Sequence, residues 1–123
     1  MKTYFIYTSI VEAMTGLGLI FVPATVVRIL FVTEPGSSLA IILAMIGGAA
    51  IFSVALATWM ARLSVRPLAE IRMLLFYNAA VSLILIYSSL KLGFGGVILW
   101  GVIIFHLIQT VVSALMLKNK GSE

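Results

Sequence analysis

Residues Tyr4 to Val32 read YFIYTSIVEAMTGLGLIFVPATVVRILFV, and this stretch decides the fold of the chain. About 20 apolar residues in a helix are enough to cross the hydrocarbon core of a bilayer, and the part from Tyr4 to Val22 comes close to that length. Glu12 lies inside it, roughly 12 Å along the helix axis from Tyr4 at ~1.5 Å per residue. An ionisable side chain at that depth is by default a candidate functional group and needs a polar partner.

The composition of the whole chain agrees with this interpretation. Of 123 residues, 63% are hydrophobic and only 10% are charged, and the mean hydropathy is +1.23. Soluble domains have about 25% charged residues, so we predict an integral membrane protein, and the length indicates a single domain over residues 1–123. The absence of cysteine excludes disulfides, thiolate metal sites and cysteine nucleophiles. The net charge of +4 does not indicate nucleic-acid binding, because the cations lie at the ends of the apolar segments.

Four long apolar segments predict an all-α fold, a polytopic bundle of four transmembrane helices. Pro23 removes a backbone donor and disfavours a helical conformation at Val22, so the first helix is expected to kink or end there. The extension that follows either continues the first helix at a new angle or lies as a short helix in the membrane interface. The second alternative is favoured because the first ~20 residues already span the bilayer. The expected helices cover residues 3–22 with the extension 24–32, then 38–62, 67–91 and 97–117.

The second expected helix is rich in small residues at intervals of four. Such residues allow helices to approach closely in lipid, where packing rather than the hydrophobic effect holds them together. One stripe contains Ala40, Ala44 and Gly48, and a second contains Ala49, Ser53 and Ala57. We predict helix packing at Gly48, Ala49, Ser53 and Ala57.

Polar side chains recur at helical spacing in the other three segments. His106, Gln109, Thr110 and Ser113 follow the spacing i, i+3, i+4, i+7, Asn78 and Ser82 are four apart, and Glu12 shares a face with Thr8, Thr15 and Gly16. Each unpaired polar group facing lipid would cost several kcal/mol, so these faces should point inward. The helix depths place the central residues within one layer roughly 5 Å thick, at ~1.5 Å per residue. We therefore predict one buried polar cluster of Glu12, Asn78, His106 and Gln109.

Two interpretations of this cluster remain open. It is either a hydrogen-bonded plug that fixes helix register, with Glu12 protonated or paired with His106, or a proton or ligand site of titratable groups. Haem ligation is less favoured, because the single histidine would need a second subunit to form a bis-histidine site. The number and spacing of ligands do not suit a metal. We predict no catalytic residue, no metal and no cofactor.

The chain resembles the small four-helix, DoxX-like membrane proteins of bacteria over most of its length. The resemblance rests on Gly16-Leu-Gly18 followed by Pro23, on Gly47-Gly48 followed by Trp59-Met-Ala-Arg62, on Asn78 and on His106. DoxX itself is associated with a quinone-linked thiosulfate oxidoreductase, and no catalytic residue is carried over from it. Glu12, the length and the four helices are also similar to the small multidrug resistance transporters. The aromatic first-helix motif and the glycine-rich later motifs of those transporters are not recognisable in this chain.

Three classes of function compete. The leading one is a non-enzymatic membrane protein, either an accessory or structural subunit or a small bundle that handles lipid or quinone. Its partners would be the lipid bilayer and either further copies of itself or the subunits of a larger membrane complex. No nucleic-acid partner is expected. The first alternative is a small proton-coupled transporter that acts as a dimer with Glu12 as the coupling acid. The second alternative is a membrane oxidoreductase component that uses His106.

The distribution of cations predicts the orientation in the membrane. With four crossings, one side carries Lys2, Arg62, Arg66, Arg72, Lys118 and Lys120, and the other carries Arg28 and Lys91. Loops on the cytoplasmic side carry an excess of Lys and Arg. Six cations against two place both termini in the cytoplasm, in a multi-pass protein of the cell (inner, cytoplasmic) membrane.

Cysteine labelling tests this orientation without background, because the chain has no cysteine of its own. A cysteine at Ser37 should react with a membrane-impermeant maleimide added outside intact cells. A cysteine at Asn119 should react only after the membrane is opened. The reverse pattern would contradict the orientation.

Overall fold

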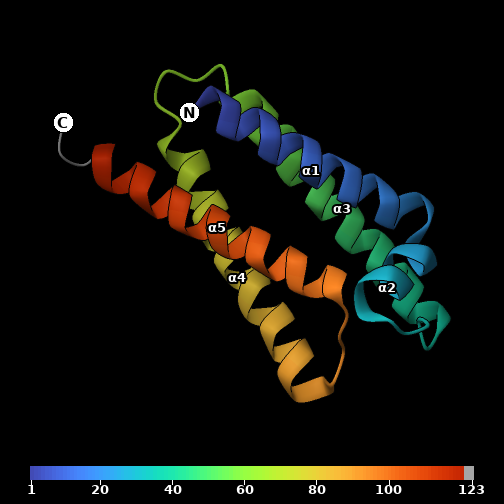
Figure 1. Ribbon diagram of the computed structural model, residues 1–123. Coiled ribbons are helices and arrows are strands. Elements are labelled where there is room, and N and C mark those ends of the chain that lie inside the picture. Colours follow the sequence, from blue (N-terminus) through green and yellow to red (C-terminus); the bar gives the residue numbers. More distant parts are fainter. Residues whose placement is uncertain (121–123) are drawn as a thin grey trace. The chain divides into compact units, whose positions relative to one another are not determined.

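The computed structural model describes residues 1–120, and all secondary structure in this range is α-helical (Figure 1). The helices are α1 (Lys2–Phe21), α2 (Pro23–Phe31), α3 (Ser38–Ala61), α4 (Leu68–Leu92) and α5 (Val97–Lys120). By length and composition, α1, α3, α4 and α5 are each able to cross a membrane. The prediction of an all-α protein with four apolar, membrane-capable helices is therefore confirmed.

The chain passes from α1 to α2 at a single residue. Val22 has φ −136° and ψ 53°, outside the helical region, and Pro23 occupies the first turn of α2. The residue before a proline avoids helical dihedrals, and proline suits a first turn where its missing N–H is not needed. The Val22 N–H still donates to Gly18 O at 2.8 Å. The extension expected at 24–32 is thus a helix of its own.

The connection from α2 to α3 carries an exposed ion pair. Arg28 donates from Nε to Glu34 Oε1 at 2.6 Å and from Nη2 to Glu34 Oε2 at 2.9 Å. These hydrogen bonds hold the pKa of the Glu34 carboxyl below its ordinary value. The contribution of the pair to stability is therefore complete above the ordinary glutamate pKa and is lost as the pH falls through the lowered one. Ser37 then caps α3, since its Oγ accepts from the Ala40 N–H at 3.2 Å.

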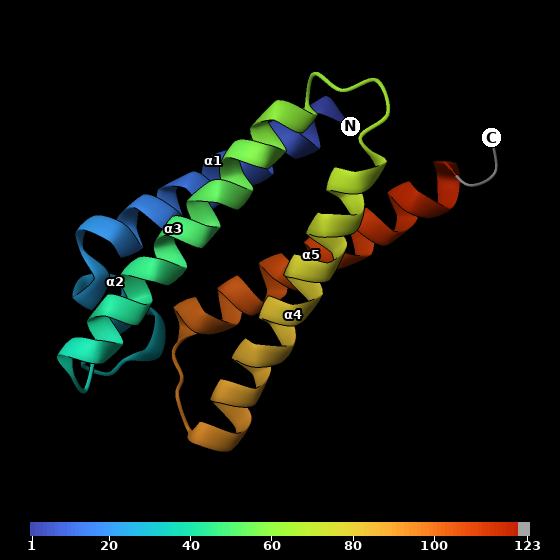
Figure 2. The ribbon, with the colours of Figure 1, turned by 180° about the vertical axis from the view of Figure 1, so that it is seen from behind.

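The described chain forms two compact units. The first, Met1–Arg66, contains α1, α2 and α3, and the second begins at Pro67 and contains α4 and α5. In the first unit α1 and α3 run antiparallel side by side, and α2 packs against both (Figures 1 and 2). In the second unit α4 packs on α5, and the turn between them begins at Gly93, whose φ of 72° favours glycine. A single four-helix domain stays a prediction.

The contact between α1 and α3 depends on two glycines. A Cβ added to Gly16 would lie 2.8 Å from Gly48 O and 2.8 Å from Phe52 N. A Cβ added to Gly48 would lie 2.7 Å from Leu19 Cβ and 2.8 Å from Gly16 O. Any side chain at either position would separate the two backbones, so these helices touch along their main chains.

The two small-residue stripes of α3 face different surroundings. Gly48 is buried against α1, whereas Ala49 and Ser53 are exposed and Ala57 is half-buried. Ser53 turns its hydroxyl back to Ala49 O at 2.9 Å, which satisfies it within its own helix. Helix packing at Ala49, Ser53 and Ala57 stays a prediction, because the contact with α1 uses the neighbouring face.

Alanine at Gly48 should destabilise the first unit, and alanine at Gly47 should not. A Cβ at Gly47 would meet nothing within 4 Å, so Gly47→Ala is a matched control one residue away. Overpacking of this kind costs about 1–3 kcal/mol, and Gly48→Ala should lower the midpoint of unfolding in a mixed-detergent titration accordingly. Equal midpoints for the two variants would contradict the close contact.

Candidate functional site

The second unit has a buried hydrogen bond between its two helices. His106 Nδ1 on α5 and Asn78 Oδ1 on α4 are 2.7 Å apart. Asn78 is fully buried and His106 is 6% exposed. Two of the four residues of the predicted cluster are therefore in direct contact, and we call this pair, together with Ser82 and Thr110, the polar seam.

The hydrogen bonds of Asn78 fix the tautomer of His106. The Nδ2 of Asn78 donates to the carbonyl oxygen of Leu74 at 2.7 Å, so its amide oxygen is the atom that faces His106. That oxygen accepts only, and the proton in the bond therefore belongs to His106 Nδ1. In a neutral imidazole the lone pair then lies on Nε2, which makes Nε2 the hydrogen-bond acceptor of this ring.

The hydroxyls of the polar seam are satisfied within their own helices. Ser82 donates to Asn78 O and Thr110 donates to His106 O, each at 2.8 Å. Both bonds span four residues, the pattern that serine and threonine use where water is absent. The two hydroxyls of the polar seam therefore need no partner from outside their own helices, and the bond between Asn78 and His106 links α4 to α5.

Two aromatic rings pack against the imidazole ring of His106. Tyr77 and Phe105 both meet His106 edge to face, with ring centroids 5.8 Å and 5.3 Å away. Such contacts add to the packing of the ring beyond its buried area. They restrict His106 to the orientation that its bond to Asn78 already selects.

The other two residues of the predicted cluster are also buried. Gln109 is 4% exposed and lies one turn beyond His106 on α5, and Glu12 is 2% exposed on α1. Glu12 belongs to the first unit and Gln109 to the second. That Glu12 joins the other three stays a prediction, and so do the two interpretations of the cluster as a plug or a proton site. Among residues 1–120, no group of three or more His, Asp or Glu side chains is arranged to hold a metal.

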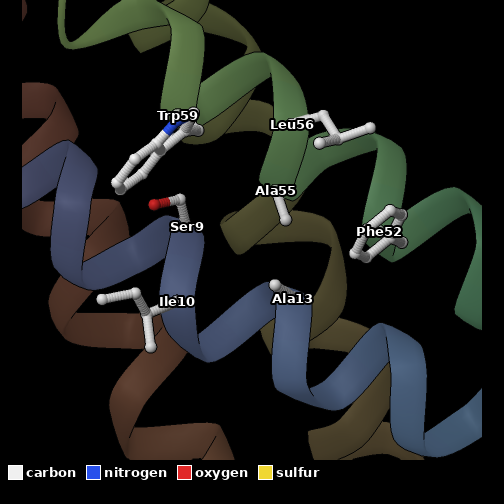
Figure 3. Close-up of a pocket in the computed structure, with 7 residues that line it drawn as sticks. All are labelled: Ser9, Ile10, Ala13, Phe52, Ala55, Leu56 and Trp59. Atoms are coloured by element: carbon white, nitrogen blue, oxygen red, sulfur yellow. The ribbon is translucent and has the colours of Figure 1, made fainter.

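A groove between α1 and α3 is a feature that the sequence did not predict. It is open, almost wholly apolar and about 250 Å³ in volume. Its lining residues are Ser9, Ile10, Ala13, Phe52, Ala55, Leu56 and Trp59 (Figure 3). Trp59 and Ser9 lie at one end and Phe52 at the other (Figure 3). Small residues on both helices, Ala13 and Ala55, leave the space that larger side chains would fill.

The tryptophan end of the groove carries a cation. The guanidinium carbon of Arg62 lies 3.7 Å from the centroid of the Trp59 ring. Arg62 follows Ala61, the last residue of α3. The signal in the sequence was the spacing Trp59-x-x-Arg62, which places the two side chains on one face at a helix end.

Comparison of the chain with protein-family models, with curated proteins and with solved structures gave no match.

A double-mutant cycle on Asn78→Leu and His106→Phe should show coupling between the two helices. Each single change leaves a buried polar partner unpaired, whereas the double change removes both. Hydrogen bonds between membrane helices couple by about 0.6 kcal/mol on average and up to about 1.7 kcal/mol. The free energies of unfolding in mixed detergent micelles measure this coupling.

Thr110→Ala provides the control for that cycle, because Thr110 bonds to the backbone of its own helix. Its coupling to Asn78→Leu should be near zero. A coupling between Asn78 and His106 no larger than that of this control would contradict the assigned bond.

Proposed function

We propose that this protein is a multi-pass membrane protein that crosses the bilayer four times, with both termini in the cytoplasm. We further propose that it is non-enzymatic and acts as a lipid-handling bundle, either alone as a homo-oligomer or as an accessory subunit of a larger membrane complex. The observation that carries the proposal is the open apolar groove between α1 and α3.

A groove of this kind suits an acyl chain. In a bilayer the hydrophobic effect does not distinguish the groove from bulk lipid, because lipid tails are as apolar as leucine. What distinguishes it is shape, since a chain held between two helices gains contacts of about 0.1–0.2 kcal/mol per atom pair. The close approach at Gly16 and Gly48 fixes the two walls relative to each other, so the groove is formed before a lipid enters.

The proposed orientation places the tryptophan end of the groove at the cytoplasmic face. Trp59 lies near the end of α3, and tryptophan is enriched at membrane–water interfaces, where its ring sits at the level of the headgroups. Ile10, Ala13 and Phe52 then lie deeper, at the level of the acyl chains. In this orientation α2 would lie near the opposite interface, at an angle to the bilayer normal.

The exposed stripe of α3 supports the assembly that we propose. Ala49 and Ser53 leave a shallow strip on the face of α3 beside the one that packs on α1. Small residues at this spacing allow another helix to approach closely. A second copy or a partner subunit would pack on this strip.

Filling the groove should remove a bound lipid. Ala13→Phe places a ring among the lining residues, and Met14→Phe is the matched control because Met14 is 71% exposed and does not line the groove. Loss of about ten atom contacts at ~0.1 kcal/mol each gives ~1 kcal/mol, or about fivefold less retained phospholipid. Native mass spectrometry of the full-length protein in mild detergent counts the retained lipids.

Thermal unfolding of both variants checks that the fold is kept. Equal lipid retention by Ala13→Phe, Met14→Phe and the unchanged protein would contradict a lipid site in this groove.

A further inference from the structure

Arg62 is held at the tryptophan end of the groove. Its guanidinium carbon lies 3.7 Å from the Trp59 ring centroid, and Trp59 is one of the lining residues (Figure 3). Stacking on an aromatic face restrains a long, flexible side chain and leaves the edge of the guanidinium group directed away from the ring. The cation is therefore positioned beside the mouth of the groove.

One donor of Arg62 has no acceptor within the described chain. The Nε atom is buried, and among residues 1–120 it has no hydrogen-bond partner. Buried polar groups are nearly always paired, and an unpaired donor on a charged group is costly. Arg62 as a whole is only half-buried, so an acceptor from outside the chain would meet the guanidinium group at the exposed part of the side chain and offset part of that cost.

The surrounding charge indicates an acceptor that is anionic. Residues 1–11 and 57–66, which form this end of the first unit, include Lys2, Arg62 and Arg66 and no acidic residue. Arginine pairs with phosphate through parallel, charge-assisted hydrogen bonds. In the proposed orientation this end also faces the cytoplasmic leaflet, where anionic lipids attract cations close to the membrane surface.

We infer that the groove between α1 and α3 holds an anionic phospholipid, with an acyl chain against Ile10, Ala13 and Phe52 and the phosphate on Arg62. This inference rests on the proposed lipid-handling function and adds selectivity for the headgroup. The apolar groove accounts for binding of any phospholipid, whereas Arg62 accounts for preference for a negatively charged one.

Competition between two lipids with identical acyl chains tests the inference. The full-length protein in mild detergent is mixed with equal amounts of phosphatidylglycerol and phosphatidylcholine, and native mass spectrometry counts each bound lipid. Both lipids offer a phosphate to Arg62, but the quaternary ammonium of phosphatidylcholine repels the guanidinium group. Since a basic residue near a charged headgroup contributes about 1 kcal/mol, the unchanged protein should prefer phosphatidylglycerol by about fivefold. Arg62→Gln should lose this preference. Arg66→Gln removes the same charge from the same connection and should keep most of the preference, because Arg66 is exposed rather than stacked on Trp59.

Each outcome bears on a distinct part of the inference. Equal losses in Arg62→Gln and Arg66→Gln would overturn it, because diffuse charge would then explain the preference. No preference in the unchanged protein, a result that needs no variant to fold, would also overturn it while leaving the groove as a lipid site. Failure of the unchanged protein to retain either lipid would overturn the proposed function as well.

Discussion

The hydrocarbon interior of a membrane offers no hydrogen bonds, and we propose that the rest of this structure follows from that constraint. In such an interior every backbone group must be paired within a helix, and the four long apolar segments are helical as this requires. The same constraint applies to side chains. Thr15, Ser53, Thr58 and Thr110 all donate to a carbonyl four residues earlier on their own helix. Asn78 and His106 instead form a hydrogen bond with each other, between two helices.

The two units meet this constraint by different means. In the first, α1 and α3 approach each other closely enough for their backbones to touch at Gly16 and Gly48. In the second, a buried hydrogen bond between Asn78 and His106 marks the contact between α4 and α5. Packing through small residues brings backbones close at one point and leaves space beside it where other small residues follow. The groove at Ala13 and Ala55 is a consequence of that packing.

Much of the fold could be predicted from the sequence, because proline, glycine and serine mark helix ends by local chemistry. The pairing of Asn78 with His106 could also be anticipated, since both are polar residues at matching depth. The groove could not be predicted, because the empty space between two helices depends on how their side chains pack against each other. Periodicity alone could not distinguish the stripe of Gly48 from that of Ala49 and Ser53, since both have small residues four apart. The relation of Glu12 to the polar seam depends on contacts between distant segments, which local patterns do not specify.

We propose that an acyl chain lies in the groove beside Trp59, and quenching of Trp59 fluorescence tests this most directly. Trp59 and Trp100 are the two tryptophans of the chain, so Trp100→Phe leaves Trp59 as the sole reporter. The protein is reconstituted with phospholipid brominated on the upper part of its acyl chains, extracted in mild detergent and freed of bulk lipid. If a lipid is held in the groove, the fluorescence of Trp59 should stay quenched after the bulk lipid is removed. Full recovery of Trp59 fluorescence, to the level seen with unbrominated lipid, would contradict the claim.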